Sequence, residues 1–185
     1  MLLWLFRWRV EGEEHIPRTG PVILAANHLS NWDPILVGAA CSRPVHFMAK
    51  EEMFRSRWLA WLLTRIHAFP VRRGSADRRA LRTALDRLAQ GEVLGIFPEG
   101  TRSKTGELAR PQPGIAMLAL RSGAPVVPVA CIGSDRVLPL GWKRPLLVRV
   151  GEPICYEELY GTRLSAPLME TVSQDIMEHV RRLIS

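Results

Sequence analysis

The chain has 185 residues, 47% hydrophobic and 23% charged, which predicts one domain with a full core and excludes a disordered tail or a disulfide miniprotein. Basic residues outnumber acidic ones by 25 to 18, for a net charge of +7, and all but three of the basic residues are arginine. Because the planar guanidinium suits phosphate, this excess favours an anionic partner: a nucleic acid, an anionic membrane or a phosphorylated substrate. The three cysteines, Cys41, Cys131 and Cys155, are widely separated and form no Cys-x-x-Cys pair. This pattern excludes a zinc knuckle or a disulfide framework and suits a reducing cytosol.

The chain begins with a short apolar segment followed by arginines. The candidate membrane segments, residues 1–6 and 58–63, are each far shorter than the ~18 to 20 apolar residues that cross a bilayer. Arg7 and Arg9 follow the first run instead of preceding it, which is not the pattern of a signal peptide. We interpret residues 1–9 as an interfacial amphipathic helix and residues 10–185 as the domain, with Trp4 and Trp8 either at the lipid headgroups or packed on the domain.

Strands and helices alternate through the rest of the chain. After a connector that runs to residue 20, continuous or alternating apolar runs predict strands at 21–26, 45–49, 68–71, 92–97, 125–132 and 146–150. Asp33-Pro34 has the pattern of a helix N-cap followed by proline and opens a helix to residue 40. Further helices are predicted at 51–65, 75–90 (with Ser75 as its cap), 115–121 and 166–184. This order predicts a single α/β domain with a mixed, largely parallel sheet flanked by helices.

The first candidate site is the segment 27–33, directly after the buried strand at 21–26. A histidine acts as a base through one ring nitrogen when an acceptor orients the other, and a loop that curls back can bring Asp33 to His28. Asn27 adjoins the histidine. The alternative interpretation is that Asp33 only caps its helix and His28 is a polar loop residue.

Two further strand ends carry groups that suit an anionic ligand. In the segment 97–103, Gly100 lets the backbone approach a ligand, Arg102 and Ser103 are donors for phosphate, and Glu99 suits an arginine or a hydroxyl. In the segment 69–74, two arginines stand at the end of a strand, Arg72 and Arg73. Each segment alone is also consistent with a solvated polar turn.

Taken together, these segments resemble a known family. Asn27-His28 with Asp33, then Phe69-Pro70-Val71-Arg72-Arg73-Gly74, then Phe97-Pro98-Glu99-Gly100-Thr101-Arg102-Ser103, then Val126-Val127-Pro128-Val129 are similar in order and spacing to the four motifs of the 1-acylglycerol-3-phosphate acyltransferases, which are glycerolipid acyltransferases of the HX4D type. The resemblance covers residues 10 to 155. It implies a glycerol-3-phosphate acyltransferase-like fold, with residues 10–185 as the acyltransferase domain.

The resemblance also implies roles. His28 would act as general base on the acceptor hydroxyl, oriented by Asp33, and Arg73 would bind the acceptor's phosphate. Acceptor binding is implied for the third motif, Glu99, Gly100, Thr101 and Arg102. Lesser candidates are Lys50 near the oxyanion, and Asn27, Arg72 and Ser103. No metal is implied, and the fourth motif around Pro128 is expected to be a core strand.

The implied substrates are lysophosphatidic acid and an acyl thioester of acyl carrier protein or coenzyme A as co-substrate, with no other cofactor. The product would be phosphatidic acid in phospholipid biosynthesis. Since the acceptor resides in a bilayer, we expect a peripheral enzyme at the cytoplasmic face of the cell membrane, with no nucleic-acid partner. The segment 51–65 is a second candidate for membrane contact, with Arg55, Arg57 and Arg65 beside Trp58 and Trp61, unless these aromatic residues are core.

Three alternatives remain at this stage. The acceptor can be glycerol 3-phosphate, an ornithine lipid or another lysophospholipid. A basic nucleic-acid-binding domain fits the charge and the arginines at 78–87, but aromatic residues make up only 7% of the chain and do not gather near them. A serine hydrolase would rely on Ser30, and the chain has no G-x-S-x-G nucleophile elbow. One departure from the family pattern is His67, where many members have glycine.

Overall fold

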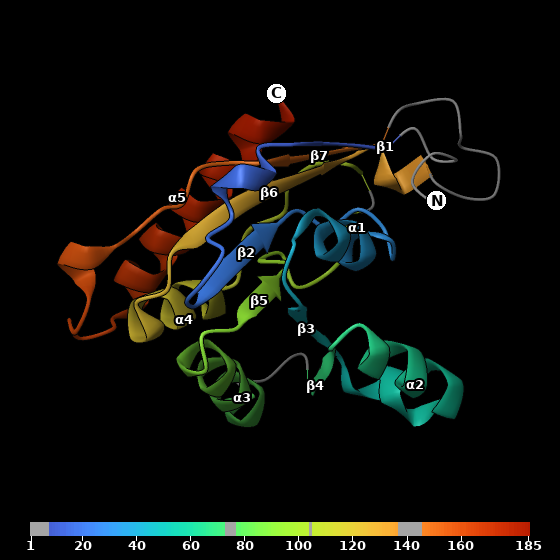
Figure 1. The fold of residues 1–185 in the computed structure, drawn as a ribbon. Helices are drawn as coiled ribbons and strands as arrows, with labels where there is room; N and C mark the ends of the chain where they lie inside the picture. The colour runs from blue at the N-terminus through green and yellow to red at the C-terminus, as the bar shows by residue number, and fades with distance from the viewer. Residues whose placement is uncertain (1–7, 73–76, 104, 137–145) are drawn as a thin grey trace.

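A computed structural model describes residues 8–72, 77–103, 105–136 and 146–185 (Figure 1). Its centre is a seven-stranded sheet in the order β1-β7-β6-β2-β5-β3-β4. All neighbours are parallel except β6 and β7, which are antiparallel. The strands are β1 Trp8–Glu11, β2 Val22–Ala26, β3 Val45–Lys50, β4 Phe69–Val71, β5 Val93–Ile96, β6 Val126–Ile132 and β7 Leu146–Val150.

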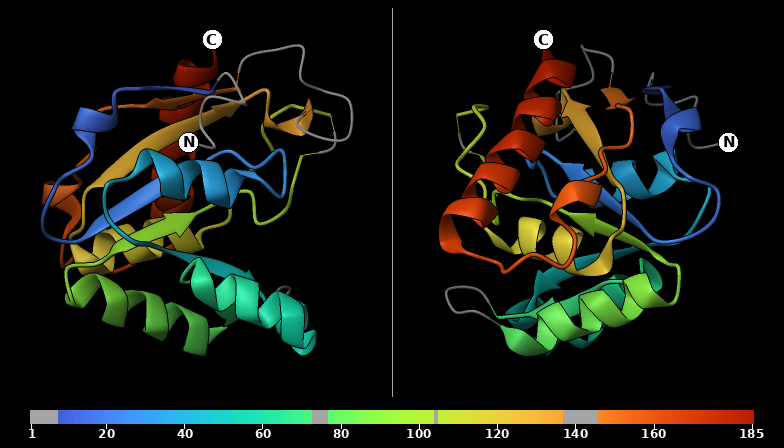
Figure 2. Two further views of the ribbon diagram at one scale, coloured as in Figure 1. Left: turned by 45° about the vertical axis from the view of Figure 1, so that its right-hand side comes forward. Right: turned by 90° about the vertical axis from the view of Figure 1, so that its left-hand side faces the viewer.

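Helices cover both faces of the sheet. They are α1 Asp33–Ala40, α2 Arg57–Arg65, α3 Arg78–Ala89, α4 Gly114–Ser122 and α5 Ala166–Ile184. Helix α1 packs on one face, where alternate residues of β2, β6 and β7 form one apolar cluster. Helices α3, α4 and α5 pack on the other face, over a second cluster. The right-hand view of Figure 2 shows α1 and α5 on opposite sides of the sheet. The expected α/β domain with a mixed, largely parallel sheet is therefore confirmed.

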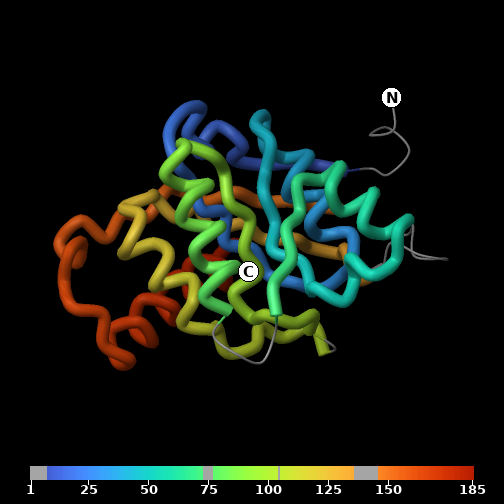
Figure 3. The backbone as a smooth tube through the Cα atoms, turned by 90° about the horizontal axis from the view of Figure 1, so that it is seen from below, coloured from blue at the N-terminus to red at the C-terminus, as the bar shows by residue number. Residues whose placement is uncertain are grey.

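Helix α2 lies at the edge of this layered arrangement. The chain leaves β3, forms a 3-10 turn at Glu51–Arg55, and enters α2, from which it returns as β4. Seen from below in Figure 3, α2 and α3 lie on either side of β4. The apolar spacing predicted one helix over 51–65, but Ser56 interrupts it: its backbone is extended (ψ 119), and its hydroxyl accepts from the N–H of Leu59 to cap α2.

Two further expectations need correction. Trp8 and Arg9 do not end a helix but begin β1, which pairs parallel with β7; the rest of the expected helix, residues 1–7, lies outside the described residues. Trp8 and Val10 alternate inward and pack against the apolar cluster under α1, which is the period of a strand. The cap of α3 is Asp77, whose carboxylate accepts from the N–H groups of Arg79 and Ala80, while Ser75 lies outside the described residues.

Candidate active site

The loop after β2 brings His28 and Asp33 together. The apolar run of β2 ends at Ala26 in the middle of the sheet, and the loop curls back so that His28 Nδ1 lies 2.9 Å from Asp33 Oδ2. The same carboxylate oxygen accepts from the N–H groups of Leu29 (2.6 Å) and Ser30 (2.7 Å). Asp33 is fully buried and occupies the first turn of α1, with Trp32 at the N-cap. Its side chain therefore organises the histidine loop instead of capping its own helix.

This pairing determines which ring nitrogen can accept a proton. A carboxylate only accepts hydrogen bonds, so the contact assigns the ring proton to Nδ1 and leaves Nε2 as the basic nitrogen. The imidazole is largely buried, with 9% of the residue exposed. Ser30 is not arranged as a nucleophile: its hydroxyl accepts from the N–H of Trp32 at 3.4 Å, and the described residues show no hydrogen bond between it and His28. The pair is a base with its orienting group.

Two crossing hydrogen bonds join His28 to the loop after β5. The His28 N–H donates to Glu99 Oε1 at 2.9 Å, and the Ser103 N–H donates to the His28 carbonyl at 2.8 Å. Glu99 Oε2 accepts from the Ala109 N–H at 2.9 Å, and the side chain is 4% exposed. Both carboxylate oxygens of Glu99 are thus engaged by backbone. Glu99 holds the two loops together instead of presenting its carboxylate to solvent.

Asn27 fixes the other side of the histidine. Its Nδ2 donates to the Cys131 carbonyl at 3.0 Å, and its Oδ1 accepts from the Cys131 N–H at 2.7 Å. The side chain therefore continues the pairing of β2 with β6 beyond Ala26 and Val129. Burial and the negative charge of Asp33 raise the pKa of the Cys131 thiol well above its ordinary value, so this cysteine is neutral beside the site.

A stack of rings supports the imidazole. His28 stacks on Phe97 with ring centroids 4.2 Å apart, and Phe97 stacks on Phe47 at 6.0 Å. Phe47 has room because Gly95 has no side chain: a Cβ there would lie 2.2 Å from the Phe47 ring. Sequence reasoning missed Phe47 and Gly95, since they are apolar residues of ordinary strands and their role arises only from packing.

The cations expected in the site differ in their surroundings. Thr101 and Arg102 are exposed, and Gly100 takes a left-handed conformation (φ 71) that turns the loop. Lys50 lies 3.6 Å from Glu52, and Arg72 pairs with Glu51 at 2.6 Å, which raises the pKa of Arg72. The predicted phosphate ligand Arg73 lies outside the described residues. Among the expected cations that the structure describes, Arg102 lies on the loop after β5, which is hydrogen-bonded to His28, and its side chain is exposed.

Comparison with known proteins decides the family. The acyltransferase family model matches residues 7–132, more than half of the chain. The chain belongs to the acyltransferase family. A 1-acyl-sn-glycerol-3-phosphate acyltransferase of Bacillus subtilis is 32% identical over 180 residues, covering 95% of this chain and 89% of that protein. A lyso-ornithine lipid O-acyltransferase of Pseudomonas aeruginosa is 39% identical over 127 residues, covering 68% of this chain and 47% of that protein.

A solved structure agrees with this assignment. The crystal structure of the 1-acyl-sn-glycerophosphate (LPA) acyltransferase PlsC from Thermotoga maritima superposes with a TM-score of 0.70 and 28% sequence identity, over 94% of this chain and 71% of that one. The resemblance stated from the motifs is confirmed, and so is the expected acyltransferase fold. The chain is therefore an enzyme of the acyltransferase class.

The acyltransferase has an apolar cavity beside the loop that is held to His28. Its volume is about 760 Å³, and residues 95–101 form one wall of it, including Phe97, which stacks on His28. The opposite walls come from α3 and α4, from Met48 in β3 and from Val71 at the end of β4. Sequence reasoning identified the wall at 97–101 but not the walls from β3, α3 and α4, because the residues of those elements are typical of a core.

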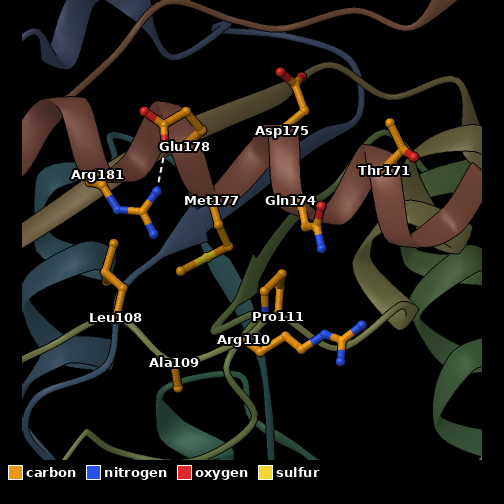
Figure 4. Close-up of a pocket in the computed structure, with 10 residues that line it drawn as sticks. All are labelled: Leu108, Ala109, Arg110, Pro111, Thr171, Gln174, Asp175, Met177, Glu178 and Arg181. Atoms are coloured by element: carbon orange, nitrogen blue, oxygen red, sulfur yellow. Dashed lines mark hydrogen bonds and ion pairs between the residues drawn. The ribbon is translucent and has the colours of Figure 1, made fainter.

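A second hollow of about 580 Å³ lies between residues 108–111 and α5 (Figure 4). Gln174, Met177 and Arg181 of α5 point toward this loop, and Arg181 pairs with Glu178. The neighbouring Ala109 donates to Glu99, so α5 backs the segment that binds the loop after β5. Among the described residues, no three His, Cys, Asp or Glu side chains are grouped so that they could hold a metal ion.

Proposed function

We propose that this acyltransferase transfers an acyl group from a thioester to the free hydroxyl of 1-acylglycerol 3-phosphate, giving phosphatidic acid. The observation that carries the proposal is the 2.9 Å contact between His28 and the buried Asp33, within a chain that aligns along 95% of its length with a relative of that name. The donor is acyl carrier protein or coenzyme A thioester, and the reaction uses neither a metal nor another cofactor.

The proposed chemistry needs no acyl-enzyme. His28 Nε2 takes the proton of the acceptor hydroxyl as its oxygen attacks the thioester carbonyl, and Asp33 stabilises the imidazolium that forms. The tetrahedral intermediate then collapses, the carbon–sulfur bond breaks, and the thiolate leaves with the proton from the imidazolium. One ester bond forms and one thioester bond is lost, so that His28 is returned to its neutral form.

The surroundings of His28 support this division of roles. The apolar cavity behind Phe97 has the size and lining of a site for an acyl chain. We assign the acceptor's phosphate to Arg102 and Arg73, since a guanidinium offers two parallel donors to a phosphate. Glu99 and Asn27 are positioning residues. The Glu99 side chain binds the backbone N–H of His28, and the side chain of Asn27, the residue before His28, binds the backbone of Cys131.

The enzyme is proposed to act as a peripheral protein at the cytoplasmic face of the membrane, where its lipid acceptor resides, without a nucleic-acid partner. Within the described ranges, no helix is both long and apolar enough to cross a bilayer.

A second acceptor is favoured by one specific observation. The relative with 39% identity over 127 residues, which covers 68% of this chain, is named as acting on lyso-ornithine lipid. Lyso-ornithine lipid is therefore the second candidate acceptor. It carries no phosphate, so a phosphate-binding role for Arg102 would not apply to it.

The test is a matrix of acyl donors and acceptors with the purified protein, read as formation of the labelled product lipid. We expect 1-acylglycerol 3-phosphate to be the best acceptor and His28→Ala to lower turnover by at least about 100-fold with an unchanged thermal unfolding curve. Retained turnover in folded His28→Ala would exclude the general-base role. Faster acylation of lyso-ornithine lipid would establish the second candidate instead.

A further inference from the structure

Helix α2 carries the most exposed large apolar side chains in the described part of the chain. Trp58 is 71% exposed and Trp61 is 55% exposed, and their rings lie 5.9 Å apart. Leu63 is the only residue of α2 that is buried. At about 100° per residue, Trp58 and Trp61 stand on the side of the helix away from Leu63. Two adjacent indoles directed away from the core indicate a surface that contacts something else.

Unpaired cations accompany these tryptophans. Arg57 and Arg65 lie within the same arc of about 100° as the two indoles, and Arg55 precedes them in the 3-10 turn. All three are exposed, and none of them forms an ion pair with any other residue that the structure describes. The Arg65 guanidinium lies 4.9 Å above the Trp61 ring. We call Arg55, Arg57, Trp58, Trp61 and Arg65 the α2 face.

The acidic residues nearby do not cancel this charge. Glu51 is paired with Arg72, and Glu52 with Lys50. A backbone hydrogen bond lowers the pKa of the Glu52 carboxyl, and the charge of Arg55, which attracts Glu52, also helps to lower it. No acidic residue is paired with Arg57 or Arg65 in the described part of the chain. The α2 face therefore combines a net positive charge with two exposed indole rings. Arginine binds lipid phosphates, and tryptophan prefers the headgroup level of a bilayer, where its ring is in apolar surroundings and its N–H remains hydrated.

We propose that the α2 face docks the protein on an anionic phospholipid bilayer. The inference rests on the proposed function, in which the acceptor is a membrane lipid. Charge complementarity indicates this partner. Three guanidinium groups without ion pairs match anionic headgroups, and the two indoles match the interface between the headgroups and the acyl chains. A second copy of this chain would bring the same positive charges together and repel.

The position of the α2 face connects it to the cavity. The 3-10 turn follows β3 directly and β4 follows α2, and Met48 of β3 and Val71 of β4 both line the cavity beside the catalytic loops. Figures 1 and 3 show α2 beside β3 and β4 at this edge of the sheet. A bilayer on the α2 face would thus lie next to the wall of the cavity, so that a lipid reaches the catalytic loops without leaving the membrane surface.

The experiment measures binding to vesicles of phosphatidylcholine with about 30 mol% phosphatidylglycerol by co-sedimentation. Trp58→Ala/Trp61→Ala removes the indoles, and we expect affinity to fall by at least about tenfold. Arg57→Gln/Arg65→Gln should lower affinity by about 25-fold, since each arginine near an anionic leaflet contributes about fivefold, and should weaken its dependence on salt. The matched control is Arg121→Gln/Arg163→Gln, which removes two exposed arginines elsewhere and should change affinity little.

Each outcome supports or overturns the inference. Wild-type binding by both α2-face variants overturns it, as do an equal loss in the arginine control and a wild-type protein that does not bind the vesicles. Sedimentation without vesicles checks whether the α2 face instead joins two copies, which would also overturn it. Acyl transfer to acceptor dispersed in detergent micelles, where docking is not needed, should be equal in the wild type and both α2-face variants. If the wild type binds vesicles through the α2 face but transfers no acyl group in micelles, the proposed function is refuted while the docking proposal is supported.

Discussion

Glu99 lies between two loops and has no free carboxylate oxygen. Its partners are the N–H groups of His28 and Ala109, and the first of these belongs to the residue that carries the proposed base. The family motif associates this glutamate with the acceptor. The geometry assigns it a different contribution, because an engaged, buried carboxylate sets the place of His28 relative to the loop at 97–103.

Glu99→Gln separates these two roles. The amide offers one oxygen for two N–H donors, so one buried donor loses its acceptor and the free energy of unfolding should fall by about 1–3 kcal/mol. We expect a lower kcat with little change in KM for the acceptor, measured by steady-state kinetics beside chemical denaturation. A raised KM at unchanged kcat and stability would show that Glu99 binds the acceptor directly.

Arg102 lies on the same loop as Glu99 but is exposed, and it forms no ion pair with any residue that the structure describes. Arg102→Gln should raise KM for a phosphorylated acceptor by about tenfold or more, because a charge-assisted bond to phosphate is lost. Stability should remain at the wild-type value. The check is the ratio of KM values for 1-acylglycerol 3-phosphate and for an acceptor without phosphate, and an equal change for both would contradict the assignment.

Among the elements, β5 and β3 depend on each other through Gly95 and Phe47. Gly95→Ala would place a methyl group 2.2 Å from the Phe47 ring, so the ring must move, at a cost of about 1–3 kcal/mol in unfolding free energy. Because Phe47 stacks on Phe97 and Phe97 on His28, kcat should fall as well. Thermal denaturation and turnover measure the two effects.

The matched control is Gly114→Ala, where an added Cβ meets nothing within 4 Å. It lies in the first turn of α4, so its stability should be unchanged or slightly higher. Equal stability of the two alanine variants would show that Phe47 adapts without cost.

Elements with a strong local pattern were predictable from the sequence. Helix α5 matches its predicted bounds, 166–184, and the apolar runs of β2 and β6 are found within one residue of their predicted starts. Strand β1 was missed because its four residues form a strand only by pairing with β7, which is far away in the chain. The helix predicted over 51–65 was too long, since apolar spacing does not reveal the extended backbone at Ser56.

In the candidate site, too, some features were predictable from the sequence and others were not. The approach of His28 to Asp33 and to the loop at 97–103 was expected from the motifs and is present in the structure. The engagement of Glu99 by backbone was not predictable, because a motif names a residue without its partners. His67 also gains an explanation: it has φ 54, and among the described residues it is the only non-glycine with positive φ, so glycine in its place would adopt this backbone without strain.

For the whole molecule, the response to acid has an identifiable contributor. His46 is 8% exposed, and its Nε2 lies 3.1 Å from Glu92. Burial lowers the pKa of His46 below 6.5, and the attraction of Glu92 only partly opposes this. Below that pH the unfolded chain binds a proton that the folded chain does not, so the free energy of unfolding decreases as pH falls.

His46→Gln should therefore flatten the loss of stability between about pH 7.5 and pH 5.5, measured by chemical denaturation at a series of pH values. His179→Gln, on helix α5, is the control and should keep the wild-type slope. A slope unchanged in His46→Gln would show that other groups govern the response.

The hydrogen bonds around His28 also bear on how the protein is made. Residue 27 is held by residue 131, and residue 28 by residue 99, so the site needs partners that the ribosome adds 104 and 71 residues later. A nascent chain that has displayed only its histidine loop has no fixed geometry there. We therefore expect the proposed site to form only after residue 131 has emerged from the ribosome, so that a shorter nascent chain cannot act on lipid.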